Sequence, residues 1–199
     1  MKFIRSKCYH EPVLALKIDG IKYFAADAMG VREFRGELVL NLSGNPNLVS
    51  SERMPSELSE HIVVPFKEIM VPWPDGGVPL VKASFWQALH NYVRDNDYRN
   101  VCLHCEAGHG RTGTALSSMA ITNLAWSTEK AINHIRAKVC RHMVETSEQC
   151  EYLLGLDYEM NGRLAKEEDL PNPSLNIMIE EYYAEKQKEE EEERKRKEE

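Results

Sequence analysis

The sequence predicts an α/β fold with a central, mostly parallel sheet of about four to five strands, flanked by helices. Short apolar runs at 37–42 and 101–103 have the length of buried strands. Between them, over 81–94, apolar residues recur every four positions, which is typical of an amphipathic helix. Strands that are separated by helices favour a parallel sheet with helices packed on it.

The remaining elements follow from turn and capping signals. Two β-prone runs flank Asp19-Gly20, a pair that favours a tight hairpin turn. Ser127 and Thr146 are suitable N-caps for two further helices. The expected strands are 13–18, 21–25, 37–42, 61–66 and the run before Cys105; the expected helices are a short one within 50–60, then 81–94, 112–124, and those that begin after Ser127 and Thr146.

Length and charge indicate one domain with a tail. We expect a single globular domain over residues 1–170 and a helical, highly charged C-terminal tail over 171–199. In the tail, each glutamate of 190–193 precedes a cation by four residues, a spacing that stabilises a helix surface. A solubilising extension is the simplest interpretation, and the sequence names no partner for it.

Composition excludes several classes of partner and compartment. A formal net charge of −7 argues against nucleic acid, and no run approaches the roughly 20 apolar residues of a membrane span. The N-terminus shows no secretory signal, and five cysteines are an odd number for a disulfide framework. We therefore expect a cytoplasmic protein that has no membrane partner.

The most informative stretch is 101–114, where a buried strand leads through a glycine-rich loop into a helix. Such a loop directs backbone N–H groups and a helix dipole at one centre, which favours an anion. Gly108 and Gly110 allow a close approach, and Arg111 offers a planar fork of donors to phosphate oxygens. Cys105 lies at the start of this loop, where the positive potential of the N–H groups and the helix dipole stabilises a negative charge. It is therefore expected to exist partly as a thiolate, and Thr112 could hydrogen-bond its sulfur.

The string from His104 through Cys105 and five residues to Arg111, Thr112 and Gly113 resembles the phosphate-binding loop of the cysteine-dependent protein tyrosine phosphatase superfamily. The resemblance implies that Cys105 is the nucleophile of a phosphocysteine mechanism and that His104 fixes the loop geometry. The simpler interpretation, a buried cysteine beside an ordinary turn, fits only a bare Cys-x5-Arg. The implied phosphate-binding residues are Glu106, Ala107, Gly108, His109, Gly110 and Arg111, with Thr112 assisting catalysis.

A second motif, Trp73-Pro74-Asp75 followed by Gly77-Val78-Pro79, lies 30 residues before the cysteine. Alone, it would be interpreted as a surface turn anchored by Trp73. It resembles the mobile general-acid loop of tyrosine-specific phosphatases. That resemblance implies that Asp75 protonates the leaving oxygen.

A third segment, 143–149, resembles the glutamine-bearing segment that positions the hydrolytic water in tyrosine-specific phosphatases. The first glutamine is replaced by Glu145, while Gln149 matches the second. Glu145 and Gln149 are therefore candidates for positioning water. The competing interpretation, which the capping pattern favours, is a helix that starts at Thr146.

Departures from the tyrosine-specific pattern indicate a compact dual-specificity-like phosphatase. No counterpart of the tyrosine-bearing, depth-setting loop is found, and the chain is short. Positions 106–110 contain no lysine but do contain Glu106, which opposes a highly anionic ligand. A phosphoprotein is thus the expected substrate, ahead of an inositol polyphosphate. The non-enzymatic alternative is a phosphopeptide-binding module.

No cofactor or metal is expected from the sequence. Cys102 and Cys105 form a C-x-x-C, but no second pair follows at zinc spacing. A disulfide between Cys102 and oxidised Cys105 is a further hypothesis.

Overall fold

The computed structural model describes Cys8 and residues 10–44 and 67–163 of the chain. The predicted strand 61–66, the predicted helix within 50–60, the boundary near residue 170 and the charged tail lie outside these residues.

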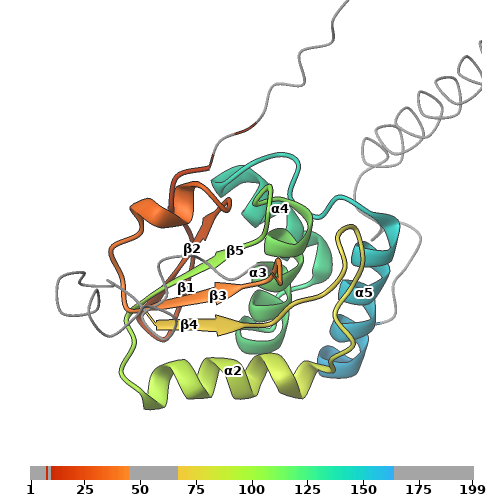
Figure 1. Cartoon of the computed structure of the whole chain (residues 1–199). Helices are drawn as coiled ribbons and strands as arrows, with labels where there is room; N and C mark the ends of the chain where they lie inside the picture. Colours follow the sequence, from red (N-terminus) through yellow and green to blue (C-terminus); the bar gives the residue numbers. More distant parts are fainter. Residues whose placement is uncertain (1–7, 9, 45–66, 164–199) are drawn as a thin grey trace, which may run out of the picture. The chain divides into compact units, whose positions relative to one another are not determined.

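The described elements include two consecutive strands at the start and three consecutive helices at the end (Figure 1). The strands are β1 (Val13–Ile18), β2 (Ile21–Ala26), β3 (Leu38–Asn41), β4 (Lys67–Met70) and β5 (Asn100–His104). The helices are the short 3-10 helix η1 (Gly30–Glu33), α2 (Ala83–Asp95), α3 (Gly110–Leu124), α4 (Thr128–Lys138) and α5 (Ser147–Asn161).

The five strands form one sheet in the order β1-β2-β5-β3-β4, and the predicted fold class is confirmed. Strands β2, β5, β3 and β4 run parallel, and only β1 is antiparallel to its neighbour. The predicted hairpin joins β1 to β2. Its turn residues Asp19 and Gly20 have φ values of 49° and 80°, which is the left-handed backbone that the Asp-Gly pair favours.

The edge strand β4 was not predicted. It begins at Lys67, directly after the run 61–66 that carried the prediction, and two of its four residues are exposed. Edge strands are often short and carry charged side chains, as β4 does with Lys67 and Glu68, so they show little apolar pattern. The short η1 helix was also missed. It is fixed by Asp27, whose carboxylate accepts from the N–H groups of Met29 and Gly30.

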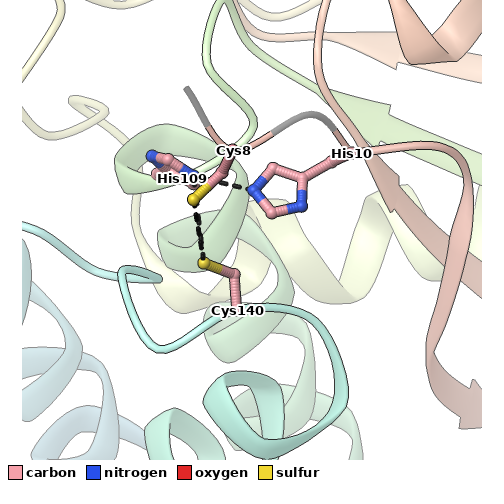
Figure 2. A group of neighbouring side chains, drawn as sticks. All are labelled: Cys8, His10, His109 and Cys140. Atoms are coloured by element: carbon pink, nitrogen blue, oxygen red, sulfur yellow. Dashed lines mark hydrogen bonds between the residues drawn. The ribbon is translucent and has the colours of Figure 1, made fainter. Parts of the chain in front are cut away.

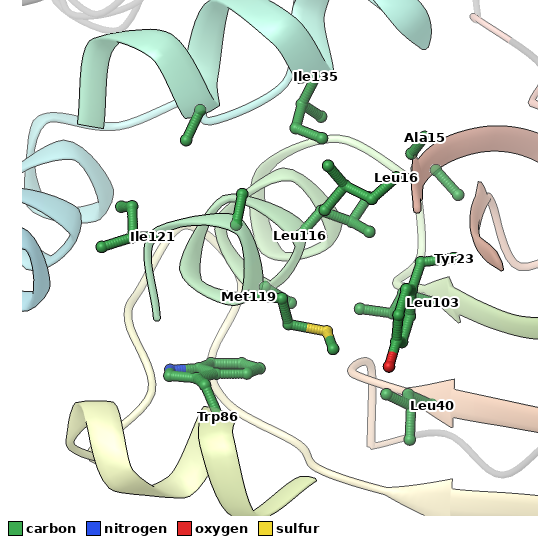
Figure 3. Close-up of a cluster of buried hydrophobic side chains, with 14 of the residues drawn as sticks. Ala15, Leu16, Tyr23, Leu40, Trp86, Leu103, Leu116, Met119, Ile121 and Ile135 are labelled. Carbon is green, nitrogen blue, oxygen red and sulfur yellow. The ribbon is translucent and has the colours of Figure 1, made fainter. Parts of the chain in front are cut away.

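The main core lies between the sheet and helices α2–α5 (Figure 3). The sheet contributes Tyr23, Leu40 and Leu103, and the helices contribute Trp86 and Met119, all of them fully buried. A smaller cluster covers the opposite face of the sheet and contains Ala26, Val31, Phe34, Val39 and Cys102. Because β5 is buried on both faces, its sequence is a continuous apolar run rather than an alternating one.

Helix α3 is buried along most of its length and packs against α2, α4 and α5. Small hydroxyl side chains make this possible. Thr114, Ser118 and Thr122 each donate to the carbonyl four residues earlier, at 2.8 Å, so their hydroxyls are satisfied within the helix itself. Within residues 10–44 and 67–163, every helix is too short or too polar to serve as a membrane span.

Candidate active site

The predicted site residues gather at one edge of the sheet, where the parallel strands end. Cys105 follows β5 directly, and α3 starts at Gly110, so the predicted strand-loop-helix arrangement is present. The loop that carries Asp75 follows β4 at the same edge. In open sheets with parallel strands, ligand sites form at the carboxyl ends of the strands.

Two glycines let the phosphate loop and α3 approach their neighbours. Gly108 has a φ of 73°, and a Cβ there would lie 2.8 Å from the carbonyl oxygen of Ala26 at the end of β2. A Cβ on Gly113 would lie 2.7 Å from the backbone nitrogen of Val144. The loop therefore fits closely between β2 and the segment that precedes α5. Within the loop, Glu106 and Ala107 are exposed.

Arg111 connects two loops. One is the loop 105–110, called the phosphate loop, and the other is the loop 71–79 that carries Asp75, called the acid loop. The side chain of Arg111 is 6% exposed, and Nη1 donates to the carbonyl oxygen of Trp73 at 3.2 Å and to that of Leu42 at 3.4 Å. Nη2 lies 3.0 Å from Oδ1 of Asp75, whose side chain is 83% exposed. The two motifs that are separated by 30 residues in the sequence thus meet at one guanidinium.

Trp73 fixes the base of the acid loop. It is buried, and its ring packs edge-on against Trp86 of α2 with the ring centroids 6.4 Å apart. The interpretation of Trp73 as an anchor is therefore confirmed. It is compatible with the interpretation of Asp75 as an acid, because the anchor is buried while the carboxyl remains at the surface.

The N-terminus of α5 holds the other side of the acid loop. Thr146 and Gln149 form the predicted capping box, which confirms the helix start. The same side chains reach the loop: Thr146 Oγ1 donates to the carbonyl oxygen of Gly76 at 2.9 Å, and Gln149 Nε2 donates to that of Gly77 at 3.2 Å. Gln149 is fully buried, and its Oε1 accepts from the N–H of Glu145 at 2.8 Å.

Glu145 contacts the phosphate loop directly. Its Oε2 accepts from the N–H of Gly110 at 3.0 Å, and its Oε1 lies 3.4 Å from Nδ1 of His109. A carboxylate beside the first N–H groups of a helix is favoured by the helix dipole. The two candidate water-positioning residues therefore differ in exposure to solvent. Glu145 is half-exposed beside the phosphate loop, whereas Gln149 is fully buried.

Arg136 of α4 supports the backbone that precedes α5, a role that the sequence did not indicate. Its Nε and Nη2 donate to the carbonyl oxygens of Met143 and Val144, at 2.9 and 3.0 Å. Val144 has a φ of 61°, an unfavourable value for a β-branched residue, and these hydrogen bonds help to hold it. No local pattern signals this contact, because it depends on how α4 packs beside α3.

His104 and Thr112 were predicted to assist Cys105. His104 is buried, with Nδ1 at 3.3 Å from the carbonyl oxygen of Cys105, and burial lowers its pKa from the ordinary value. Thr112 Oγ1 and Arg111 Nε are buried and have no hydrogen-bond partner within the described residues. The predicted bond from Thr112 to the sulfur of Cys105 is therefore not formed in this structure.

Cys102 lies in β5 and belongs to the cluster on one face of the sheet, whereas Cys105, which directly follows β5, belongs to the main core on the other face. Burial raises the pKa of the Cys102 thiol. This arrangement argues against the predicted disulfide, because Cys102 would have to leave its own cluster to reach Cys105.

Sequence and structure comparisons find proteins that are similar to this chain. Two curated relatives from Methanocaldococcus jannaschii, the uncharacterized proteins MJECL20 and MJ0215, are 33% and 31% identical over 88 residues. These matches cover 43% of this chain and 56% and 52% of the relatives, so the chain spans about half the length of the curated relatives it matches.

Solved structures share the fold at low sequence identity. Tk-PTP in its active form has a TM-score of 0.55 at 19% identity, over 74% of this chain and 96% of that one. PTPMT1 in complex with PI(5)P has a TM-score of 0.51 at 20% identity, over 75% and 98%. A variant of human DUSP28 has a TM-score of 0.55 at 12% identity, over 76% and 97%.

The model of the protein-tyrosine phosphatase family matches residues 50–156, which is more than half of the chain and includes both the acid loop and the phosphate loop. The chain therefore belongs to the protein-tyrosine phosphatase family.

Proposed function

We propose that this protein hydrolyses phosphomonoesters through a covalent phosphocysteine at Cys105, with a phosphoprotein as its substrate. The observation that carries the proposal is the position of Arg111. A buried guanidinium six residues after the cysteine bonds the backbone of the acid loop and pairs with the exposed carboxylate of Asp75. The residues to which we assign the roles of nucleophile, anion-binding group and acid thereby lie at one edge of the sheet.

Unpaired donors support phosphate binding at this loop. Buried polar atoms are normally hydrogen-bonded. Arg111 Nε and Thr112 Oγ1 are buried without an acceptor within the described part of the chain. Phosphate oxygens would supply those acceptors, and backbone N–H groups of the loop other than that of Gly110, which donates to Glu145, would add further donors.

The proposed reaction has two steps. The Cys105 thiolate attacks phosphorus, an S–P bond forms, and the bond from phosphorus to the leaving oxygen breaks while Asp75 donates a proton to that oxygen. Water then attacks phosphorus, Asp75 takes its proton, and Cys105 leaves as thiolate. Phosphate and Asp75 compete for Nη2 of Arg111. Substrate binding would thus release the carboxyl from its ion pair, next to the leaving group.

Within this mechanism we assign different roles to Glu145 and Gln149. Glu145 lies half-exposed beside the phosphate loop and remains our candidate for positioning water. Gln149 is a positioning residue, since its amide is occupied by the acid loop and by the cap of α5. It would keep Asp75 in reach of the leaving oxygen without touching the substrate.

The charges around the loop support a phosphoprotein rather than an inositol polyphosphate. The exposed carboxylates of Glu106 and Glu145 add negative charge beside the bound phosphate. One phosphate can be neutralised by Arg111 and the loop amides, whereas additional phosphates would meet these carboxylates. We also propose a reducing compartment, because Cys105 must stay a thiolate to react.

The test is phosphate release from an aryl phosphate, a phosphopeptide and an inositol polyphosphate. Cys105→Ser should abolish release, and Asp75→Asn should lower kcat by about 10²–10⁴ with the phosphopeptide, whose leaving group needs the proton. The phosphopeptide should have a higher kcat/KM than the inositol polyphosphate. Equal release by native protein and Cys105→Ser would refute the mechanism, and binding of phosphopeptide without turnover would indicate a binding module.

A further inference from the structure

Four side chains of types that bind metals come from three distant stretches of the sequence and meet at the phosphate loop. Figure 2 shows Cys8, His10, His109 and Cys140 directed toward one another. Their ligand atoms all lie within 4.8 Å of one another. Two come from the segment that precedes β1, one from the phosphate loop, and one from the connection between α4 and α5. We infer that they bind one zinc ion.

The distances are close to those of a tetrahedral site. With Zn–S of about 2.3 Å and Zn–N of about 2.05 Å, tetrahedral edges are about 3.8 Å between sulfurs, about 3.6 Å from sulfur to nitrogen and about 3.3 Å between nitrogens. The sulfurs of Cys8 and Cys140 are 4.0 Å apart, and Cys140 Sγ is 3.9 Å from His109 Nε2. The two imidazole nitrogens, at 2.7 Å, would need to separate by about 0.6 Å.

The ligand set selects zinc by its chemistry. Two thiolates and two neutral imidazoles are a common donor set of structural zinc sites, and their charges balance a divalent ion once both thiol protons are released. All four positions come from the protein, so the site is closed to substrate. We therefore assign it a structural role, distinct from the chemistry at Cys105.

The groups behind the ligands are arranged to hold them. Nδ1 of His109 lies 3.4 Å from Glu145, and a carboxylate on the second ring nitrogen fixes the orientation of a zinc-binding histidine. The N–H of His10 donates to the carboxylate of Asp27 at 2.9 Å, and its carbonyl accepts from the N–H of Asp27 at 3.2 Å. A Cβ on Gly30 would collide with that carbonyl, which shows how closely the segment is packed there.

The consequence for the molecule is a link between three segments. His109 is part of the phosphate loop, so an ion bound to it would tie that loop to the N-terminal segment and to the segment that carries Glu145. The sequence prediction of no metal considered only Cys102 and Cys105. The Cys8 and His10 pair, His109 and Cys140 are separated by about 30 to 100 residues, and they form no recognisable zinc motif until the fold brings them together.

Metal content of the full chain, purified under reducing conditions without chelator and loaded with zinc alone, tests the inference. Native protein should retain one zinc per chain after dialysis. Cys140→Ser and His10→Ala should lose it, whereas Cys150→Ser, which removes a buried thiol outside the cluster, should keep it. Glu145→Gln should weaken zinc binding about 10- to 100-fold. Retention in all variants, or less than about a tenth of an equivalent in native protein, would overturn the inference.

A spectroscopic measurement covers the case in which the variants fail to fold. Native protein loaded with cobalt(II) should show thiolate charge-transfer bands together with the intense visible bands of tetrahedral cobalt. An octahedral cobalt spectrum would overturn the assignment. So would a reduced, folded native protein that binds neither ion and forms a Cys8–Cys140 disulfide on oxidation, because the two cysteines would then be a redox pair.

Discussion

Gln149 offers the sharpest test of how the acid loop is held, through its replacement by methionine. Methionine has nearly the same volume but makes none of the hydrogen bonds of the amide. Two well-placed bonds would be lost, one from the N–H of Glu145 at 2.8 Å and one to the carbonyl oxygen of Gly77 at 3.2 Å. A third, from the N–H of Thr146, is long at 3.4 Å.

At about 1 kcal/mol for each bond, and somewhat more where a buried group is left unpaired, Gln149→Met should lower the free energy of unfolding by about 2–3 kcal/mol. For a chain of this size the thermal midpoint should fall by roughly 4–12 °C. Urea titration and thermal unfolding measure both quantities. The control is Glu151→Gln, an exposed residue of α5 beyond the first turn, which should change stability by less than about 0.5 kcal/mol.

Kinetics separate the two roles that Gln149 could have. A positioning residue should show a loss of stability together with a lower kcat for phosphopeptides, whose leaving group depends on Asp75. The reasoning would be refuted by an unchanged midpoint with a reduced kcat for every substrate, since that pattern would indicate a direct action on the hydrolytic water.

Three further predictions concern the loop, its histidine and α3. Gly108→Ala should abolish phosphate-analogue binding, measured by calorimetry, and lower the thermal midpoint, because its Cβ would lie 2.8 Å from the carbonyl oxygen of Ala26 at a positive φ; unchanged binding would contradict it. Burial lowers the pKa of His104, against the raising effects of its hydrogen bond to Cys105 and of Glu68, Glu106 and Asp27. As the pH falls, the unfolded chain binds a proton on this histidine before the folded chain does. The contribution of neutral His104 to the free energy of unfolding is therefore complete above a pH of about 6.5 and is lost as the pH falls below that value. Urea titrations from pH 5 to 8 should show this loss, with a shallower slope in His104→Gln. Ser117→Ala should be neutral or stabilising by up to about 1 kcal/mol, because its buried hydroxyl has no partner within the described residues, whereas Ser118→Ala removes a 2.8 Å bond and should destabilise; the reverse order in urea would count against this account.

The parts of the fold that the sequence predicted are those with local causes. The Asp19-Gly20 turn, the capping box at Thr146 and the strand-loop-helix around Cys105 each depend on residues within one short segment. The spacing from Cys105 to Arg111 also stays within one loop. Local patterns of this kind determine backbone geometry before tertiary packing adds anything.

The parts that escaped prediction depend on residues brought together by packing. Edge strand β4 has too few apolar residues to show a strand pattern. Arg136 of α4 donates a hydrogen bond to the carbonyl oxygen of Val144 in the connection between α4 and α5. Glu145 accepts a hydrogen bond from the N–H of Gly110, which lies 35 residues earlier in the sequence. The cluster of Cys8, His10, His109 and Cys140 joins three segments in the same way. None of these contacts has a signature in the linear order of residues.

The hydroxyl ladder of α3 has a consequence for how this protein can evolve. The side chains on one face of α3 are small, namely those of Thr114, Ser118 and Thr122. Helix α5 packs against α3, and the residues at the N-terminus of α5 hydrogen-bond the acid loop. A change from a small to a large side chain on this buried face would displace α5 and, with it, the hydrogen bonds to Gly76 and Gly77. Selection acting on such interior positions, remote from any substrate, could therefore adjust the reach of Asp75 while leaving the phosphate loop unaltered.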